Sequence, residues 1–452
     1  MSRTVSMEIH GWGRYPRGRS RVLRPERVRE AVPPDEGSVI ARGQGRSYGD
    51  AAMSADGAVM LTERLNRFLS FDEETGVLRA EAGATLAEVL AVFLPRGWFP
   101  PVTPGTKFVS LGGALAADVH GKNHHRDGTL GAHVTELELA LADGTRRRCS
   151  PERDAELFWA TVGGMGLTGI ITEVSLKLAR VESAHVVVRH NAARDLDALL
   201  ELLADEEHDE RYSVAWVDSL ARGRALGRGV LMTGRHASLA ALPRDIAEPL
   251  ALKSPRRLGL PFDLPSWVLN PLSVSAFNEL YFRRQGARDV PFVTDCESFF
   301  YPLDRVGDWN RLYGARGFVQ YQCVLPPATA RGALRLLFEE LSRTRRASFL
   351  AVLKRFGAEG RGLLSFPFEG YTLALDLPVT GADLFALLDR FDELVLEHGG
   401  RVYLAKDTRL KPDSFRAMYP RFTEWLRVKQ RFDPEDRFSS DLSRRLGMGA
   451  RA

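Results

Sequence analysis

Apolar and polar positions along the first 180 residues follow two short-range patterns. Short runs rich in branched residues and bounded by Gly, Asp or Pro indicate strands, whereas apolar residues spaced three and four apart indicate helices. We therefore expect strands at 38–43, 58–63 and 167–179, a hairpin over 68–84, and helices at 85–94 and 154–164. The first helix has a defined start, because Thr85 and Glu88 have the spacing of a capping box.

The pattern changes after about residue 181, where strands alternate with longer amphipathic helices. We expect strands at 185–190, 212–219, 317–326, 348–357 and 371–379, and helices at 195–206, 330–344 and 382–400. Alternation at this spacing indicates an open sheet covered by helices on one face. The most apolar stretch, 258–274, contains several prolines, and we interpret it as a loop region that forms an apolar wall of a site.

These patterns divide the chain into three parts. We expect a first domain at 1–180, a second α+β domain at 181–400, and a C-terminal segment at 401–452 that returns to the first domain. A chain of 452 residues is long enough for two domains or slightly more. Two such domains can enclose a ligand between their cores.

The charge balance limits the class of partner. The chain has 62 basic and 58 acidic residues, which is too even to indicate nucleic acid or a membrane surface as the main partner. Only eight of the basic residues are Lys. A Lys at a confined site is therefore informative, because Arg cannot replace a compact ammonium that is able to lose its proton.

Cysteine usage and hydropathy indicate a reducing compartment. Cys149, Cys296 and Cys323 are too widely spaced to suggest a metal site or a disulfide framework. The first 21 residues lack the apolar core of a secretory signal, and no apolar run approaches the roughly 20 residues of a membrane span. These features lead us to expect a location that is either cytoplasmic or membrane-associated.

The stretch ARGQGRSYGD (41–50) is rich in glycine and suggests a phosphate-binding loop. Its glycines are spaced G-x-G-x-x-x-G, no helix follows, and the Gly-Lys-Ser/Thr of a Walker loop is absent. A second glycine run, GGMGLTG (163–169), formally contains G-x-G-x-x-G, but a predicted helix precedes it and a strand follows, the reverse of a Rossmann motif. The first loop is thus either an anion nest made of backbone N–H groups or a plain surface turn.

Another glycine-rich segment, 104–128, includes Gly112-Gly113 followed by small alanines, which suits close packing against a ligand. It continues into the sequence HGKNHH, residues 120–125. Zinc binding is one alternative, but no acidic or Cys third ligand lies near, so we expect no metal site. A solvated basic turn is another.

Three polar residues on predicted strands are weak signals when taken singly. Lys406 lies at the end of a short strand-like run beside Asp407, and a surface ion pair would explain it equally well. Lys354 lies in the strand VLKRFG, and Gln322 lies in the run QYQ. These residues indicate a binding site only if the fold brings them together.

Considered together, these segments resemble a known family. ARGQGRSYGD, PGT…SLGGALAADVHGKNHH and DAELFWATVGGMGLTGII are similar to the FAD-binding domain, of the PCMH type, in the vanillyl-alcohol-oxidase superfamily. The later segments 309–322, 364–379, 399–409 and 415–438 resemble its oxidases of polyprenyl-phosphoryl ribose, and the likeness extends from about residue 8 to 447. It implies an α+β fold, with a two-subdomain FAD-binding domain and an α+β substrate (cap) domain containing an antiparallel sheet.

The resemblance also implies which residues bind. Carried over position by position, the FAD contacts are Arg42, Gly43, Gln44, Gly45, Arg46, Ser47, Tyr48, Gly49, Asp50, Ala51, Gly105, Ser110, Leu111, Gly112, Gly113, Ala117, Asp118, His120, Ile171 and Tyr403. The implied substrate contacts are His120, Lys122, Trp216, Phe300, Gln322, Lys354, Phe356 and Lys406. We expect Lys406, Tyr48 and Gln322 at the reacting end, with Lys406 nearest the substrate hydroxyl.

Two positions depart from the pattern of the superfamily. Many members attach FAD to a His in the first loop, where this chain has Arg46. Because an arginine cannot form a histidyl–flavin bond, we expect non-covalent FAD. In the strand YTLALDLPV, Ala374 stands where the resembled oxidases of actinobacteria have a cysteine. We therefore expect that the chemistry does not require a thiol at this position.

The implied activity is oxidation of the ribose 2′-hydroxyl of a polyprenyl-phosphoryl ribose, the first half of its epimerisation to the arabinose form. It would require a separate NAD(P)-dependent short-chain reductase, and the lipid-linked substrate implies peripheral contact with a membrane. Two alternatives stay open: a soluble sugar or aldonolactone oxidase of the same superfamily, and a flavin-free protein that binds nucleic acid through its arginines.

Overall fold

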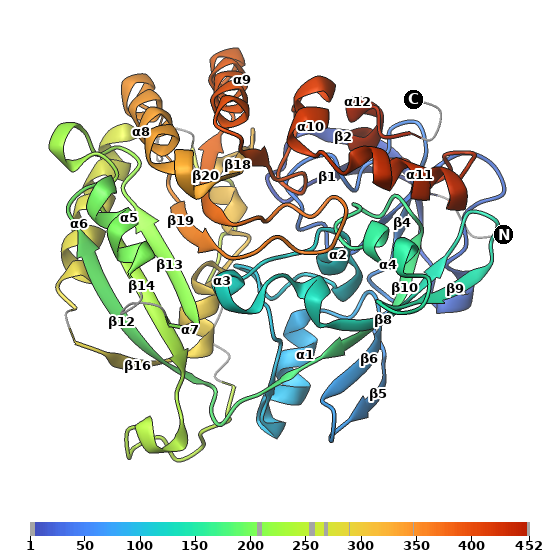
Figure 1. The fold of residues 1–452 in the computed structure, drawn as a ribbon, viewed down its shortest axis with the longest axis horizontal. Helices are drawn as coiled ribbons and strands as arrows, with labels where there is room; N and C mark the ends of the chain where they lie inside the picture. The colour runs from blue at the N-terminus through green and yellow to red at the C-terminus, as the bar shows by residue number, and fades with distance from the viewer. Residues whose placement is uncertain are drawn as a thin grey trace.

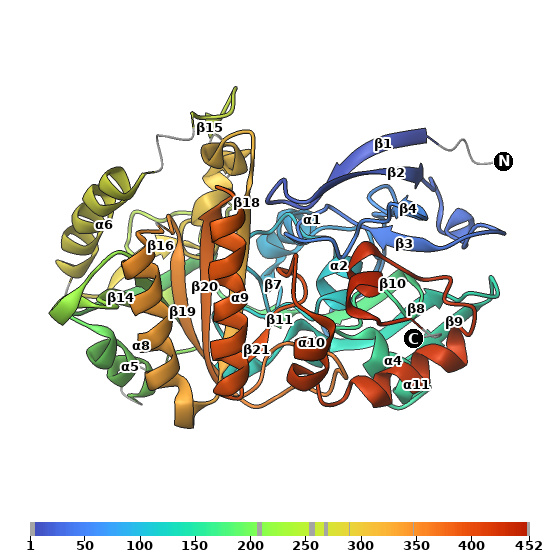
Figure 2. The same ribbon diagram turned by 90° about the horizontal axis from the view of Figure 1, so that it is seen from above.

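The computed structural model describes residues 5–205, 210–252, 258–265, 270–288, 290–346 and 348–449. Two regions lie side by side in it (Figure 1). One contains the N-terminal strands together with the C-terminal helices, and the other is built on a single large sheet. The same division is visible in the perpendicular view (Figure 2).

The N-terminal region contains a mixed sheet and an antiparallel sheet. The mixed sheet has the order β1 (Val5–His10), β2 (Arg17–Leu23), β4 (Ala58–Leu61), β3 (Val39–Arg42). The antiparallel sheet has the order β5 (Phe68–Asp72), β6 (Val77–Glu81), β10 (Ile170–Lys177), β8 (Val134–Ala140), β9 (Arg146–Cys149). The other elements are β7 (Trp98–Phe99) paired with β11 (Ala179–Arg180), and α1 (Leu86–Phe93), α2 (Leu111–Ala116), α3 (His124–Asp127) and α4 (Ala155–Thr161).

The predicted start of α1 is confirmed. The Thr85 hydroxyl accepts a hydrogen bond from the Glu88 amide at 3.1 Å, and the Glu88 carboxylate accepts one from the Thr85 amide at 2.7 Å. Both bonds satisfy amides that the first turn of a helix leaves without partners.

The second region is an eight-stranded antiparallel sheet. Its order is β16 (Phe292–Asp295), β12 (His185–Ala193), β14 (Gly229–His236), β13 (Tyr212–Val217), β19 (Ala351–Phe356), β20 (Gly370–Pro378), β18 (Phe318–Leu325), β21 (Arg401–Val402). Three helices cover the outer face: α5 (Leu196–Ala204), α8 (Pro327–Thr344) and α9 (Ala382–Glu397) (Figure 2). The predicted helices on one face are thus present.

A further helix, α6 (Pro271–Gly286), lies on the opposite face over β12 and β14. It corrects our interpretation of 258–274 as a loop for Pro271 and the three residues that follow, whereas 260–265 are irregular and 266–269 lie outside the described part. The prolines caused the error, since Pro271 occupies the first turn of the helix, where a missing N–H costs nothing. Asn270 caps this turn by accepting bonds from the amides of Leu272 and Ser273.

The described part also contains three short elements: β15 (Leu258–Gly259), α7 (Cys296–Phe300) and β17 (Val306–Gly307). Of these, α7 carries Glu297, which pairs with Lys107 of the N-terminal region, and both side chains are buried. None of the helices in the described segments is both long enough and apolar enough to cross a membrane.

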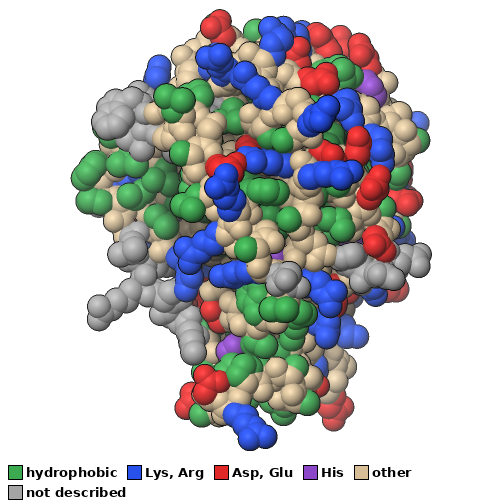
Figure 3. All heavy atoms as spheres, turned by 90° about the vertical axis from the view of Figure 1, so that its left-hand side faces the viewer, with side chains coloured by type: hydrophobic (Ala, Val, Ile, Leu, Met, Phe, Trp, Pro, Cys, Tyr) green, Lys and Arg blue, Asp and Glu red, His purple; other side chains and the backbone are tan. Residues whose placement is uncertain are grey.

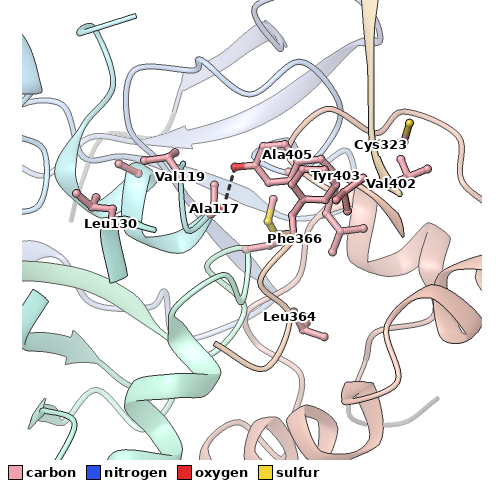
Figure 4. Packing of buried hydrophobic residues seen from close by; sticks show 14 of the residues in the cluster. Ala117, Val119, Leu130, Cys323, Leu364, Phe366, Val402, Tyr403 and Ala405 are labelled. Carbon is pink, nitrogen blue, oxygen red and sulfur yellow. Dashed lines mark hydrogen bonds between the residues drawn. The ribbon is translucent and has the colours of Figure 1, made fainter. Parts of the chain in front are cut away.

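The C-terminal segment forms α10 (Pro412–Met418), α11 (Phe422–Phe432) and α12 (Asp441–Leu446), which lie against the N-terminal region (Figure 1). The Trp425 indole donates to the Ala160 carbonyl of α4 at 3.0 Å. Before these helices, the Tyr403 hydroxyl donates to the Ala117 carbonyl at 2.8 Å within an apolar cluster (Figure 4). The segment therefore connects the edge of the large sheet to the N-terminal region.

Arg445 of α12 should be the strongest single link in this connection. Its guanidinium lies 2.8 Å from Asp50 and 2.9 Å from Asp407, two buried carboxylates. Arg445→Met would leave both carboxylates without their ion-pair partner, so we expect the free energy of unfolding to fall by about 2–3 kcal/mol. Urea denaturation followed by tryptophan fluorescence measures this change.

Arg431→Met is the matched control, because Arg431 pairs with Glu156 of the same region at the exposed surface. It should alter the free energy of unfolding by no more than about 0.5 kcal/mol. Equal losses in the two variants would contradict the assignment of Arg445 as the link.

Candidate functional site

A cavity of about 740 Å³ lies between the glycine loops of the N-terminal region and the inner face of the large sheet. Residues of β12, β13, β14, β18, β19 and β20 contribute side chains from that face. The opposite wall is formed by residues 41–52 and 103–122. The two glycine-rich segments that the sequence analysis singled out therefore face the same space.

The first glycine loop follows β3 and has the features of an anion nest. Within the described part of the chain, the amide N–H groups of Gln44, Gly45 and Ser47 have no acceptor, and all three residues line the cavity. Gly45 has a φ of +61°, a conformation that favours glycine. A side chain at Gly43 would collide with Ser110 of the second loop. The loop thus offers free donors to an anionic group such as a pyrophosphate.

The second loop leaves space for a flat group. The Ser110 hydroxyl accepts a bond from the Gly113 amide at 3.3 Å and begins α2. Gly105 lines the cavity, and a Cβ placed there would have no neighbour within 4 Å. Small side chains on this wall keep the backbone close to the cavity. The residues on both loops therefore fit a dinucleotide with a planar ring.

Most of the predicted binding residues line the cavity. From the FAD set these are Arg42, Gly43, Gln44, Gly45, Arg46, Ser47, Tyr48, Ala51, Gly105, Ser110, Gly112, Gly113, Ala117, His120, Ile171 and Tyr403. From the substrate set they are His120, Lys122, Trp216, Phe300, Gln322, Lys354 and Lys406.

Five predicted residues do not line it, and each has a partner elsewhere. Gly49 packs against the backbone of Asp407, and Asp50 is paired with Arg445. Leu111 is fully buried. Asp118 accepts bonds from the Gly131 amide and the Ser365 hydroxyl. Phe356 packs against the rings of His120 and His124, with centroids 4.8 and 4.4 Å apart. These five residues therefore support the residues that line the cavity.

Lys406, Tyr48 and Gln322 meet in one part of the cavity, although they lie on three different segments. The Lys406 ammonium lies 3.8 Å from the centroid of the Tyr48 ring. The Gln322 side-chain amide lies 3.0 Å from Nε2 of His120 and donates to the Thr372 hydroxyl at 3.1 Å. His120 Nδ1 is buried and lacks a partner among the described residues.

The Lys406 ammonium is close to losing its proton at neutral pH. Burial lowers its pKa to about 7, with Asp376 opposing the shift and Lys354 adding to it. Burial in turn raises the pKa of Asp376 to about 7, while hydrogen bonding to Gln320 opposes that shift. Asp376 was missed by the sequence analysis. Its signal was a lone carboxylate in the otherwise apolar strand 371–379.

Two further lysines reach the same cavity. Burial lowers the pKa of Lys354 to about 8 and, together with the charge of Lys354, that of Lys122 to about 7. The Lys122 ammonium donates to the Phe300 carbonyl at 3.2 Å. The Lys354 ammonium has no hydrogen bond or ion pair with any residue that the structure describes.

The lining carries positive charge alone. Among the described residues that line the cavity there are seven basic side chains and no Asp or Glu: Arg42, Arg46, Lys122, Arg288, Arg305, Lys354 and Lys406. An excess of partly desolvated positive charge on a cavity wall favours an anionic ligand. The cavity is thus suited to bind phosphate groups.

The histidines of HGKNHH do not converge. His120 faces Gln322, His124 Nδ1 accepts a bond from the Gly357 amide at 3.2 Å, and His125 Nε2 lies 2.9 Å from the Glu210 carbonyl oxygen. Burial also holds the pKa of His120 well below its usual value, so its ring is neutral. Of these three residues, His120 lines the cavity, whereas His124 and His125 do not.

Two aromatic residues that line the cavity were not predicted. Trp12 lines the cavity and lies under the Arg46 guanidinium, with Cζ 3.9 Å from the ring centroid. Tyr281 of α6 packs on Trp216 with ring centroids 4.7 Å apart. Both come from segments without a recognisable motif, so only the fold reveals them.

Comparisons with known proteins agree with this geometry. Residues 30–150 match the family described as FAD binding domain, and residues 381–446 match the family described as D-arabinono-1,4-lactone oxidase. Decaprenylphosphoryl-beta-D-ribose oxidase of Mycolicibacterium smegmatis is 39% identical over 453 residues, which cover 98% of this chain and 98% of that protein. An uncharacterized protein from the mprA 5′ region of Streptomyces coelicolor is 37% identical over 378 residues, 80% of this chain and 100% of that protein.

These matches confirm three predictions: the superfamily, the α+β architecture with a PCMH-type FAD-binding domain, and FAD as the cofactor. The unpartnered amides of the first loop and the open space beside Gly105 fit that cofactor. The chain therefore belongs to the family of FAD-dependent oxidases acting on CH–OH groups that includes decaprenylphosphoryl-beta-D-ribose oxidase.

Proposed function

We propose that this protein oxidises the 2′-hydroxyl of a polyprenyl-phosphoryl-β-D-ribose to the keto sugar, as the first half of epimerisation to the arabinose form. The observation that carries the proposal is the cation-only lining of the cavity beside the FAD-binding loops. A phosphoryl sugar supplies the negative charge that this lining lacks. The named substrate of the Mycolicibacterium relative has that chemistry.

The glycine loops would hold the cofactor. The free amides of Gln44, Gly45 and Ser47 would bind its pyrophosphate, and the small side chains around Gly105 would admit its flat parts. Bound FAD supplies the acceptor for the hydride that leaves the sugar carbon. Arg46 occupies the usual position of the tethering histidine, so we propose that the flavin is not covalently attached.

Lys406 would take the proton of the substrate hydroxyl. A pKa of about 7 leaves much of this lysine neutral near physiological pH, which suits a general base. Gln322 uses its amide hydrogens on His120 and Thr372, so its carbonyl oxygen is the group left to accept a bond from the sugar. Tyr48 packs under the ammonium and would fix its position.

Lys354 and Lys122 would bind the phosphate. Both are partly buried cations that no carboxylate neutralises. A phosphate between them would restore the pKa of each toward its ordinary value, because an adjacent anion favours the charged form. The stem of each lysine packs along the cavity wall, so the charge is presented inward.

The alternative activity, oxidation of a free sugar or aldonolactone, has one observation in its favour. The C-terminal residues 381–446 match the family described as D-arabinono-1,4-lactone oxidase. An uncharged lactone would nevertheless bring no negative charge to Lys122 and Lys354, whose charged forms burial disfavours. We therefore favour the phosphoryl sugar.

A second enzyme is required to complete an epimerisation. The keto sugar must receive a hydride on its opposite face, and an NAD(P)-dependent reductase is the class of enzyme that supplies one. We propose a separate short-chain reductase in this role. The lipid of the substrate would bring both enzymes to a membrane surface.

Substitution of Lys406 should stop flavin reduction without loss of FAD. We expect Lys406→Ala and Lys406→Arg each to slow anaerobic reduction by polyprenyl-phosphoryl ribose at least about 100-fold, because neither side chain can accept the proton at neutral pH. In the wild type, the rate at saturating substrate should rise with pH through about 7 as Lys406 loses its proton. A rate that falls through this pH, or full activity of Lys406→Arg, would contradict the role as base.

Removal of the Lys354 charge should weaken binding of the phosphoryl sugar. We expect Lys354→Gln to raise KM about 10- to 100-fold with little change in kcat, because a charged hydrogen bond to phosphate is lost. Lys177→Gln is the matched control, since Lys177 is an exposed residue of β10. Unchanged KM in Lys354→Gln, measured by flavin reduction at varied substrate concentration, would argue against phosphate binding there.

The flavin should separate from the chain on denaturation. Arg46 cannot form the histidyl bond, and Cys149, Cys296 and Cys323 are buried away from the cavity lining. Acid precipitation of the purified protein should therefore leave a yellow supernatant and a colourless pellet. A denatured chain whose mass includes FAD would overturn the prediction.

A further inference from the structure

Helix α6 presents large apolar side chains to solvent. The four most exposed large hydrophobic residues in the described part of the chain are Leu272 at 83%, Leu280 and Val290 at 66%, and Phe262 at 62%. Two of them lie on α6, and the other two lie in the segments before and after it. Single exposed leucines are common on proteins, whereas a concentration of this kind marks an interaction surface.

Helix α6 has a buried face and an exposed face. The buried face carries Val274 and Asn278, and Asn278 donates to the Asp218 carboxylate at 2.7 Å. Its outward face carries Leu272, Ala276 and Leu280, spaced four residues apart and exposed. We call Leu272, Ala276, Phe277 and Leu280 the α6 surface. Figure 3 shows the side of the molecule that carries α6, where green hydrophobic side chains gather near the left edge.

Positive charge adjoins the α6 surface. The last turn of α6 carries Arg283 and Arg284, and Arg288 follows within the next turn. The single acidic residue of the helix, Glu279, is already bridged by Arg228 at 2.7 Å and by Arg283. Exposed apolar side chains beside arginines suit contact with the surface of an anionic lipid bilayer.

The same helix also forms a wall of the cavity. Tyr281, Gln285 and Arg288 line the cavity, and the Tyr281 ring stacks on Phe277 of the α6 surface with centroids 5.8 Å apart. Arg288 is exposed as well, so the lining reaches the molecular surface at the C-terminal end of α6. A bilayer in contact with α6 would therefore lie one helix diameter from the cavity, which is about 10 Å.

We propose that the α6 surface docks the protein onto an anionic lipid bilayer and thereby brings the cavity to its lipid-linked substrate. The usefulness of docking rests on the proposed function, since only a lipid-linked substrate requires it. The docking itself is inferred from the exposed leucines and the neighbouring arginines.

The test uses the full-length, FAD-loaded protein and sedimentation with sucrose-loaded vesicles. Vesicles of phosphatidylcholine with phosphatidylglycerol are compared with vesicles of phosphatidylcholine alone. The variant L272Q/L280Q removes the apolar contacts from an exposed face and should not disturb folding. The variant L239Q/L336Q is the matched control, because Leu239 and Leu336 are exposed leucines outside α6.

We expect the wild type and L239Q/L336Q to bind the anionic vesicles and to dissociate as salt is raised. L272Q/L280Q should bind at least about tenfold more weakly. Its flavin should still be reduced at the wild-type rate by a short-chain, soluble phosphoryl ribose. Recovery of vesicle binding by L272Q/L280Q when the anionic lipid content is raised would also support the proposal.

Three results would overturn it: no binding of the wild type to either vesicle, equal weakening in both variants, or a wild-type dimer that L272Q/L280Q dissociates without changing vesicle binding. The last result would assign the α6 surface to a second copy of the chain. Vesicle binding as expected, combined with no flavin reduction by any phosphoryl ribose, would instead support docking and refute the proposed function.

Discussion

The site depends on desolvated positive charge that no carboxylate in the described cavity lining balances. Lys354 and Lys406 project into a cavity whose described lining contains no carboxylate, and burial lowers the pKa of both lysines. Such an arrangement is unfavourable until an anion enters. The free energy of ligand binding therefore includes relief of this repulsion, and the lowered pKa of Lys406 makes a base available at neutral pH.

Residues far apart in sequence meet at this site because the chain crosses between its two regions several times. Lys122 belongs to the N-terminal region, Lys354 to β19, and Lys406 follows β21 at the edge of the large sheet. The segment that carries Lys406 is held by the Tyr403–Ala117 hydrogen bond and, next to Lys406, by the Asp407–Arg445 ion pair. These contacts keep the sheet edge against the flavin-binding loops.

Local signals in the sequence predicted much of the fold. The capping box at Thr85 and the regular alternation of strands and helices after residue 181 reflect short-range physics, and the corresponding elements are present. Helix α6 was missed because proline was interpreted as a breaker at a position where it starts a helix. The partner of Lys406, Asp376, was missed because the proximity of their segments depends on sheet pairing.

The site, like the fold, was predicted only in part. Glycine loops are recognisable from spacing, and resemblance supplied the individual positions. Spacing cannot show which residues of a loop face the ligand, so Asp50 and Asp118 were assigned to FAD although the fold gives them protein partners. The absence of carboxylates from the described lining became evident only once six strands and two loops were placed around one space.

Anaerobic titration of the oxidised, FAD-loaded protein shows whether the lysines of the cavity recognise the phosphate of the substrate. Three compounds should be compared: a polyprenyl-phosphoryl ribose, the same ribose with a neutral lipid ether in place of the phosphate, and an aldonolactone. If the unpaired lysines recognise phosphate, only the first should bleach the flavin at low concentration. Equal or faster bleaching by the neutral ether or the lactone would contradict the account.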